Sequence, residues 1–308
     1  MDNFQVKEIK NNLEFIFNKF AISNGLAAEI ASRGFVFSEV EPKKILFVGL
    51  SPFYLDYSGP KMYSFKPLET AERYPRHFQK FQDIAESCEV GSDWTYLDLL
   101  FLRERDQTRV IQLLNDNTGV DFLRQQIQIS INILESINPD LIIICSSMAR
   151  PFFGIDKQIA GDDVLGVWMG YNFKFDDKFG VDVITGIHHQ SIKKGVKSTR
   201  LVGTPVLFTS ALAYFDNPTK SRLIWQMRQV LKYHYLFFGI QNFQRRGIRI
   251  DRSEKLRNQI KVLTQKLIEI RNAKSAALSV SRYIEAEKLR DSEFNINEII
   301  KLLLIAQK

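Results

Sequence analysis

The sequence has few cysteines and no long apolar run, and both absences exclude classes of protein. Cys88 and Cys145 are the only cysteines among 308 residues, and neither lies at metal-ligand spacing from other candidate ligands. We therefore expect two reduced thiols, no structural disulfide and no metal site. The longest apolar stretches, such as residues 141–145, are far shorter than the ~20 residues of a membrane helix. The first residues also lack a signal-peptide pattern, so we expect a cytoplasmic protein without a membrane partner.

Sequence motifs for several kinds of catalysis are also missing. No glycine-rich loop of the kind that cradles nucleotide phosphates is present, which argues against nucleotide hydrolysis. Ser51 and Ser210 lie outside any nucleophile-elbow pattern, and no serine, histidine and aspartate follow in the order of a known triad. We therefore expect neither a serine nucleophile nor an organic cofactor.

Positive charge is concentrated at one end of the chain. The formal net charge is +7, and residues 241–308 contain 15 Lys and Arg against 8 Asp and Glu. The whole surplus therefore lies there, and residues 1–240 are neutral overall. Such a basic tail is typical of proteins that bind nucleic acid, an acidic partner or an anionic surface, although a solvated helix face also carries such charge.

Short apolar stretches alternate with helical patterns through the middle of the chain. Strands are predicted over residues 45–50, 94–102, 141–146 and 204–213, with an edge hairpin over 171–175 and 181–187. Helices are predicted over residues 5–20, 25–32, 76–88, 119–137 and 218–236. A further helix is predicted after Ser146, with a serine cap and a stop at Gly154. This order predicts an α/β fold, a three-layer α/β/α sandwich with a mostly parallel central sheet. Ligands of such sheets bind at the carboxyl ends of the strands.

The last part of the chain predicts a helical hairpin. Apolar residues recur at helical spacing through 253–270, a weak break follows at 272–278, and a second helix continues towards the end of the chain. The chain therefore divides into N-terminal helices over 1–39, an α/β domain over 40–238 and a basic helical hairpin over 239–308.

Three segments at the predicted strand ends resemble motifs of the uracil-DNA glycosylase superfamily. FVGLSPFY (47–54) is similar to its first motif, a buried strand that ends in Gly-x-(Asp/Asn/Ala)-Pro, and Phe65 then takes the base-stacking position. VLFTSALAYFDN (206–217), just before a helix, is similar to its last motif. WTYLDLLFLRERDQ (94–107) resembles an uncharacterised bacterial branch. The resemblance covers roughly residues 40–236 and implies the α/β/α fold, DNA as partner, and excision of an extruded base.

The chain departs from this family at two places. The last motif usually reads His-Pro-Ser-Pro, and its histidine stabilises the negative charge on the leaving base, whereas residues 210–213 read Ser-Ala-Leu-Ala. Ser51 stands where many members have an aspartate or asparagine that positions water. Ordinary uracil excision is therefore in doubt, and the alternatives are another base, a differently placed catalytic pair, or loss of the chemistry.

The candidate catalytic and base-binding residues follow the predicted strands. We expect Asp56 and Ser51 to carry catalysis, because a carboxylate near this strand end can orient water or stabilise a cation-like sugar. Asp56 fits a simple turn beside Gly59 equally well. The resemblance and the strand ends together give these base-binding candidates: Phe65, Tyr54, Asp98, Arg103, Ser210 and Asn217.

Two of the base-binding candidates have a structural alternative. A charged residue in a buried strand must be paired, and Arg103 and Arg105 are the nearest partners for Asp98. That pairing forms either a structural salt bridge or one edge of a base pocket. Asn217, with Asp216 before it, either faces the pocket or caps the next helix, and capping is the better interpretation.

The candidate phosphate-binding residues lie in basic segments. They are His188, Lys193, Lys194, Lys197, Arg200, Arg245 and Arg246. His188 and His189 have no cysteine or acidic partner at ligand spacing, which argues against a metal. One of the two histidines is also a candidate to replace the missing motif histidine.

Two functions are consistent with this sequence, beside a third in which the α/β body is only a scaffold for the tail. The first is a DNA glycosylase that acts in repair or against modified foreign DNA. The second is a DNA- or nucleotide-binding module without cleavage, whose hairpin recruits a protein partner. The stretch SRYIEAEKLRDSE (281–293) is similar to a hairpin motif of nucleotide-excision-repair and Clp-regulator proteins, with these residues matching: Ala286, Leu289, Arg290 and Asp291.

Deleting residues 241–308 is expected to weaken DNA binding and to reduce its dependence on salt. The deletion removes the entire formal charge surplus, and each cation that neutralises a phosphate adds about 0.9 to the slope of log affinity against log salt concentration. Fluorescence anisotropy of a labelled oligonucleotide over a salt series measures both quantities. An unchanged affinity and slope would show that the tail does not contact DNA.

Overall fold

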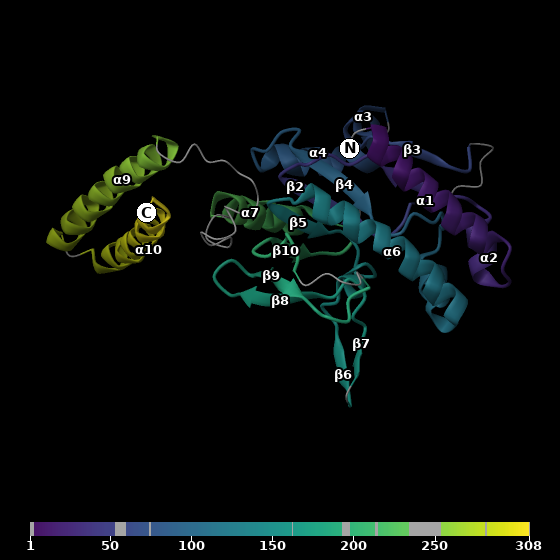
Figure 1. Ribbon diagram of the computed structural model, residues 1–308. Coiled ribbons are helices and arrows are strands. Elements are labelled where there is room, and N and C mark those ends of the chain that lie inside the picture. The colour runs from purple at the N-terminus through teal and green to yellow at the C-terminus, as the bar shows by residue number, and fades with distance from the viewer. Residues whose placement is uncertain are drawn as a thin grey trace. The chain divides into compact units, whose positions relative to one another are not determined.

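A computed structural model describes residues 3–52, 60–73, 75–161, 163–192, 198–212, 215–233, 254–280 and 282–307. The chain is a mixed α/β protein that divides into two compact units, Met1–Phe237 and Phe238–Lys308. The first unit contains a mostly parallel sheet with its helices, and the second contains two long helices (Figure 1).

The central sheet has six strands in the order β4-β2-β5-β10-β9-β8. The four parallel strands are β2 (Ile45–Gly49), β4 (Trp94–Asp98), β5 (Leu141–Ile144) and β10 (Pro205–Phe208). At one edge, β9 (Val181–Ile187) and β8 (Tyr171–Asp176) form an antiparallel hairpin, with β9 antiparallel to β10. The predicted parallel strands and the predicted edge hairpin are thus confirmed.

Helices cover both faces of this sheet. One face packs against α1 (Asn3–Ala21), α2 (Leu26–Ala31) and α6 (Asn117–Ile137), and α1 lies beside α6 (Figure 1). The other face packs against α3 (Pro67–Arg73), α4 (Pro75–Ser87) and α7 (Asn217–Tyr233). Ile45 and Phe47 of β2 belong to the second core, whereas Leu46 and Val48 belong to the first. The strand is wholly apolar because both of its faces are buried.

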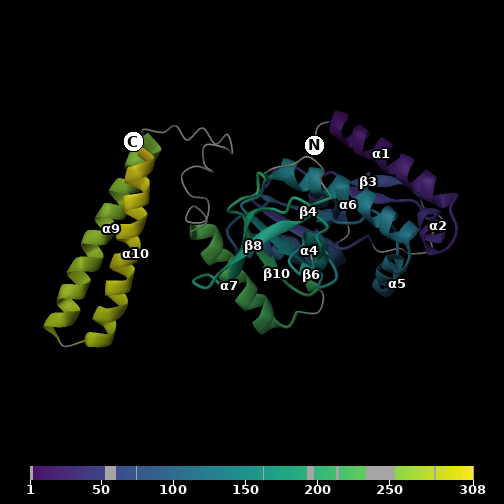
Figure 2. The ribbon, with the colours of Figure 1, turned by 60° about the horizontal axis from the view of Figure 1, so that its bottom comes forward.

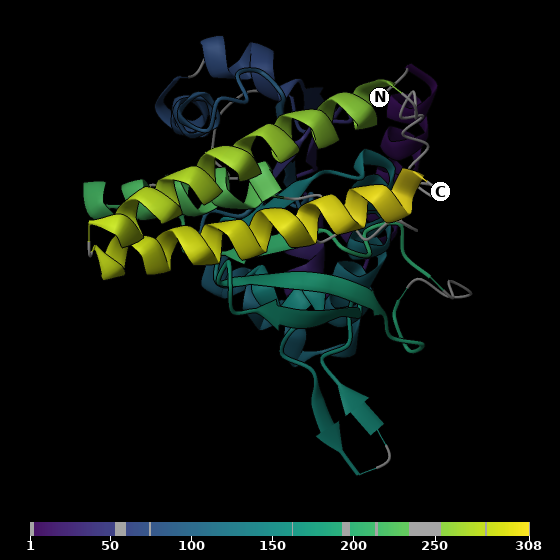
Figure 3. The same cartoon turned by 90° about the vertical axis from the view of Figure 1, so that its left-hand side faces the viewer.

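Several short elements were not predicted. β1 (Val36–Ser38) and β3 (Tyr63–Phe65) form a small parallel sheet, and β6 (Gln158–Ala160) with β7 (Asp163–Leu165) forms a hairpin that projects from the body (Figures 1 and 3). α5 (Gln107–Gln112) and η1 (Leu113–Asn115) lead into α6. The helix expected after Ser146 is only a 3-10 turn, η2 (Arg150–Phe153), which Gly154 ends at φ 84°. Such elements are too short for a periodic signal.

Side-chain caps fix the ends of the longer helices as the sequence indicates. Asp116 accepts a hydrogen bond from the Gly119 amide (2.8 Å) before α6, which ends where Asn138 adopts a left-handed conformation before Pro139. Asp216 accepts from the Thr219 amide (2.9 Å) at the start of α7. The capping interpretation of this segment is therefore confirmed for Asp216.

The second unit is an antiparallel pair of helices, α9 (Glu254–Ser279) and α10 (Tyr283–Gln307), which lie side by side in Figures 2 and 3. The predicted break at 272–278 is wrong, because α9 continues through it; its alanines favour helix. Arg271 and Lys274 of α9 both pair with Glu293 of α10. The buried seam consists of Leu267, Ala277, Ala286, Ile296 and Ile299.

Across the described parts of both units, none of the helices combines the length and the apolar character needed to cross a membrane.

A buried carboxylate joins the N-terminal helices to the segment after β4. Glu104 is 5% exposed and accepts from Arg33 (2.5 Å) and from Nε of Arg109 (3.1 Å). The Arg105 and Asp106 amides donate to its other oxygen (2.7 and 3.0 Å). Burial opposes ionisation of Glu104, but the hydrogen bonds from the Asp106 amide and from Arg33 outweigh it, so its pKa lies below the usual value.

Glu104→Gln is expected to lower the free energy of unfolding by about 2 kcal/mol at pH 7, because it removes charge-assisted hydrogen bonds. A carboxyl whose folded pKa is depressed stabilises the fold fully above the usual glutamate pKa of 4.5, and this contribution disappears as pH falls through the lower folded value. Urea denaturation at pH 7 and pH 3 measures the difference between wild type and variant, which should shrink in acid. Exposed Glu41→Gln is the matched control, and an equal loss in both variants would contradict the role of Glu104.

Candidate functional site

The candidate site lies where β1, β2 and β4 meet at the carboxyl edge of the sheet. Gly49 of β2 is in register with Asp98 of β4. The chain after Asp98 continues beside β2, since the Leu100 amide donates to the Leu50 carbonyl (2.8 Å). On its other side, the Val36 amide of β1 donates to the Phe101 carbonyl (3.0 Å). Backbone hydrogen bonds therefore hold the exits of β2 and β4 together and join the start of β1 to the chain after β4.

Asp98 is a buried carboxyl that forms no ion pair with any residue that the structure describes. Its side chain is almost fully buried, and its Oδ1 accepts a hydrogen bond from the Tyr96 hydroxyl (2.7 Å). Burial raises the pKa of Asp98 to about 7, and the hydrogen bond from Tyr96 offsets this only in part. The expected pairing of Asp98 with Arg103 or Arg105 is wrong, because its partner is a tyrosine on the same strand.

Gly49 makes this arrangement possible. A Cβ atom at this position would collide with the Tyr96 hydroxyl and with Oδ1 of Asp98. The glycine is thus required by the close approach of these two side chains to the backbone of β2, and no left-handed conformation is involved. It is the glycine of the GLSP segment whose resemblance suggested a base-binding edge.

Two serine hydroxyls at the same edge have no hydrogen-bond partner among the residues that the structure describes. They are Oγ of Ser51, after β2, and Oγ of Ser38, at the end of β1. Ser51 follows the end of β2 by two residues, and Ser38 is the last residue of β1, which belongs to the small two-stranded sheet. Asp98 and Tyr96 share the face of β4 that packs against α4.

Aromatic rings line the α4 side of this edge. Phe65 is half-buried and packs against Phe78 (ring centroids 5.6 Å apart), and Phe78 packs edge-on against Tyr96 (5.3 Å). The His77 ring also lies edge-on to Tyr96 (6.0 Å), and desolvation together with repulsion from Lys80 lowers the pKa of His77. Phe65, the predicted stacking residue, and Tyr96, the hydrogen-bond partner of Asp98, therefore both pack against Phe78.

His77 and Tyr96 were not recognised from the sequence. His77 lies in the first turns of α4, without a motif around it. Its position near the start of a helix could have indicated the site. A helix that precedes a parallel strand begins at the carboxyl edge of the sheet. For Tyr96, the signal was its spacing of two residues from Asp98.

Arg103 has a structural role. Its guanidinium is buried and donates to the carbonyls of Arg33 (3.4 Å), Pro60 (3.2 Å) and Lys61 (3.3 Å). It also lies over the Tyr63 ring (5.8 Å). Arg103 therefore fixes the chain where it enters β3. The predicted residues Tyr54 and Asp56 precede this point and lie outside the described residues.

The remaining base-binding candidates follow β10. Ser210 is exposed, and Asn217 is the exposed first residue of α7. Both belong to the carboxyl edge of the sheet, but β5 separates their strand from β2. Cys145 occupies the exit of β5, where burial above all, with a contribution from nearby Asp98, raises the thiol pKa. Ser210 and Asn217 thus share an edge with Asp98 without contacting it.

His188 and Arg200 lie at the opposite end of the sheet from Asp98. β9 is antiparallel to β10, so Ile187 and the following His188 lie towards the amino ends of the parallel strands. This position argues against His188 as a replacement for the missing motif histidine, whereas its assignment to DNA phosphates stays a prediction. The rings of His188 and His189 lie 4.3 Å apart, and desolvation, then His189 and Lys157, lower the pKa of His188.

A buried carboxylate anchors the same basic segment. Glu135 of α6 accepts from the Thr199 hydroxyl (2.5 Å), the Arg200 amide (2.9 Å) and the Tyr171 hydroxyl (3.2 Å). The Arg200 side chain is exposed. The other phosphate-binding candidates lie outside the described residues: Lys193, Lys194, Lys197, Arg245 and Arg246.

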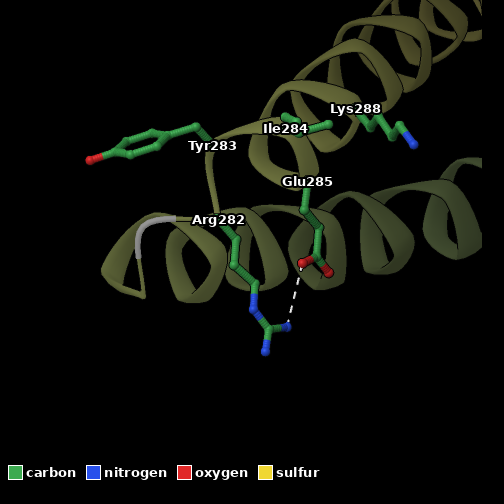
Figure 4. Close-up of a pocket in the computed structure, with 5 residues that line it drawn as sticks. All are labelled: Arg282, Tyr283, Ile284, Glu285 and Lys288. Atoms are coloured by element: carbon green, nitrogen blue, oxygen red, sulfur yellow. Dashed lines mark hydrogen bonds and ion pairs between the residues drawn. The ribbon is translucent and has the colours of Figure 1, made fainter.

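Two surface hollows have linings that do not include Asp98. One, of 490 Å³, is at the turn of the helical hairpin. Figure 4 shows Tyr283 pointing away from Glu285. Glu285 pairs with Arg282 (3.5 Å). The other, of 230 Å³, includes Lys44 and Asp140 at the amino ends of β2 and β5. Within the described part of the chain, no cluster of three or more His, Cys, Asp or Glu suits a metal ion.

Gly49→Ala is expected to lower the free energy of unfolding by about 1–3 kcal/mol, because the new methyl group displaces Tyr96 and Asp98. The matched control is Gly186→Ala on β9, where a Cβ meets only an ordinary contact with Asn172. Urea denaturation compares the two variants. Equal stability of both would show that Gly49 tolerates a side chain and that the close approach is absent.

Compared with known proteins, the chain matches no protein-family model and no curated protein. Its function is therefore inferred from the residues at the carboxyl edge and from the motifs that these residues resemble.

Proposed function

We propose that the carboxyl edge of β2 and β4 binds an extruded base of DNA and that the protein hydrolyses its N-glycosidic bond. One observation carries this proposal: the buried carboxyl of Asp98, at the carboxyl end of β4, is hydrogen-bonded to Tyr96, whose ring packs against Phe78 and His77. A nucleobase is flat and has a polar rim, so it suits a site with rings on one side and a few polar groups at its end.

The chemistry of the reaction matches the groups at this edge. Cleavage requires a held base, an oriented water molecule and stabilisation of the leaving base. Phe65 is the candidate for stacking, whereas Ser51 and Asp56 are the candidates for orienting water. Asp98 and Tyr96 form a hydrogen-bonded pair that can donate to or accept from the rim of a base. No step requires a cofactor.

Electrostatics at this edge favours the phosphates that flank a base. α4 precedes β4 and α7 follows β10, so the N-termini of both helices lie at the carboxyl edge, where their backbone dipoles attract anions. The basic surplus of residues 241–308 adds affinity for DNA without sequence preference. A module of the same fold that reads DNA without cleaving it is the second candidate, favoured by the absence of histidine from residues 210–213.

Incubation with modified oligonucleotides, followed by alkali, is expected to reveal strand breaks at one class of base. The panel contains uracil, deaminated purines and modified cytosines in single- and double-stranded DNA, together with modified phage DNA. Asp56→Ala should reduce the rate at least 100-fold, within the usual range for a proton-transfer or water-orienting group, while binding persists. Tight binding without breaks on any substrate would overturn the enzyme and support the DNA-reading module.

Phe65→Ala is expected to weaken binding of the substrate about 10-fold or more, since stacking of one base on a ring contributes about 1–3 kcal/mol. The matched control is Phe175→Ala on the far edge strand β8, where the ring is 60% exposed. Anisotropy titrations with the cleaved oligonucleotide, read before turnover, compare the two variants. Equal affinity in both would remove Phe65 from the base site.

A further inference from the structure

The carboxyl group of Asp98 has one oxygen engaged and one oxygen available. Oδ1 accepts the hydrogen bond of the Tyr96 hydroxyl. Among the described residues, no hydrogen bond or ion pair involves Oδ2. The residue is 7% exposed, and its carboxyl group is enclosed at the carboxyl end of β4. Glu104 is different, because two arginines bind its carboxylate.

Near neutral pH, Asp98 is present in both its protonated and its ionised form. Tyr96 donates from β4, Cys145 presents a thiol from β5, and α4 contributes His77 and Lys80 on the same side. None of these forms an ion pair with Asp98, and burial favours the neutral acid. A carboxyl with a pKa of about 7 is protonated in a large fraction of molecules at neutral pH, so it can donate a proton and take one back.

We infer that Asp98 is the general acid that protonates the leaving base, and that the substrates are purine-type or cytosine-type bases with a basic ring nitrogen. The inference rests on the proposed glycosylase function and names its substrate class. It also accounts for a departure in the sequence. Residues 210–213 lack the histidine that stabilises an anionic base, and a base that leaves with a proton carries no negative charge.

The reaction balances without another reactant. The bond between C1′ of the sugar and the ring nitrogen breaks, and its electron pair goes to the base. The proton on Oδ2 of Asp98 moves to a basic nitrogen of the base, which leaves as a neutral molecule. Water adds to C1′, and the proton that this water loses returns to Asp98. The net change is hydrolysis of one glycosidic bond, and Asp98 ends protonated as it began.

Uracil is a poor substrate for this arrangement. In a nucleotide, its ring nitrogens carry either the sugar or a hydrogen atom, so neither presents a lone pair to an acid. Purines have unsubstituted ring nitrogens, and cytosine has one. A neutral acid therefore discriminates between bases by proton affinity, whereas a histidine that stabilises an anion favours uracil.

The test is single-turnover cleavage by the full-length protein between pH 5 and pH 9. The substrates are matched oligonucleotides with one hypoxanthine, adenine, modified cytosine or uracil. We expect cleavage of a purine or cytosine derivative whose rate falls tenfold per pH unit above about pH 7. Asp98→Asn should lower this rate at least 100-fold and remove that pH dependence. Asp163→Asn, at an exposed position of β7, should leave both unchanged.

Two further measurements separate acid catalysis from a structural effect. Tyr96→Phe removes a hydrogen bond that lowers the pKa of Asp98, so the fall in rate should move to higher pH. If the cleaved base is a purine, a 7-deaza analogue, which lacks one basic nitrogen, should be cleaved at least 10-fold more slowly by the wild type. This comparison needs no variant and therefore does not depend on how Asp98→Asn folds.

The outcomes distinguish this inference from the proposed function. Cleavage of uracil alone would overturn the role of Asp98 and leave a glycosylase. The same would follow from cleavage of a purine or cytosine derivative at an unchanged rate and pH profile in Asp98→Asn. No cleavage of any base by the wild type would overturn both.

Discussion

The parallel pairing of β2 with β4 is the constraint on which the rest of the site depends. Both strands are buried on both faces, so β2 is wholly apolar and the one charged residue of β4 lies at its last position. Asp98 is the last residue of β4, and it can remain there only because Gly49 leaves room for it and Tyr96 hydrogen-bonds to it. The sheet thereby holds a carboxyl in a dry setting at the edge where α/β proteins bind ligands.

The sequence was sufficient to predict the strands, the long helices and the edge hairpin, because each has a clear apolar period or a turn signal. It also identified Asp98 as a buried group in need of a partner. Its partner was predicted to be an arginine, because a residue of opposite charge was preferred to a neutral residue on the same strand. Tyr96 and Asp98 are two residues apart and therefore share one face of β4, which the alternation of a strand already implies.

The direction of β9 determines at which end of the sheet His188 lies. A parallel β9 would have placed His188 beside the other strand exits, but β9 is antiparallel and places it at the far end. Apolar content alone does not determine strand direction, so the position of His188 could not be predicted from it. The continuous α9 has a similar explanation, since a locally weak apolar pattern in an alanine-rich stretch is still compatible with helix.

Glu135 holds the basic segment through a hydroxyl and a backbone amide, not through a basic side chain. The carboxylate holds Thr199 and the Arg200 backbone, and the hydroxyl of Ser191 donates to the Met169 carbonyl (2.6 Å) on the other side of residues 193–197. These contacts are made by hydroxyls and by a backbone amide, and none of them uses a basic side chain. During evolution, the exposed Arg200 side chain can therefore be exchanged without loss of these contacts. Attraction to polyanions at that end of the sheet can change from one descendant to the next while the carboxyl edge stays as it is.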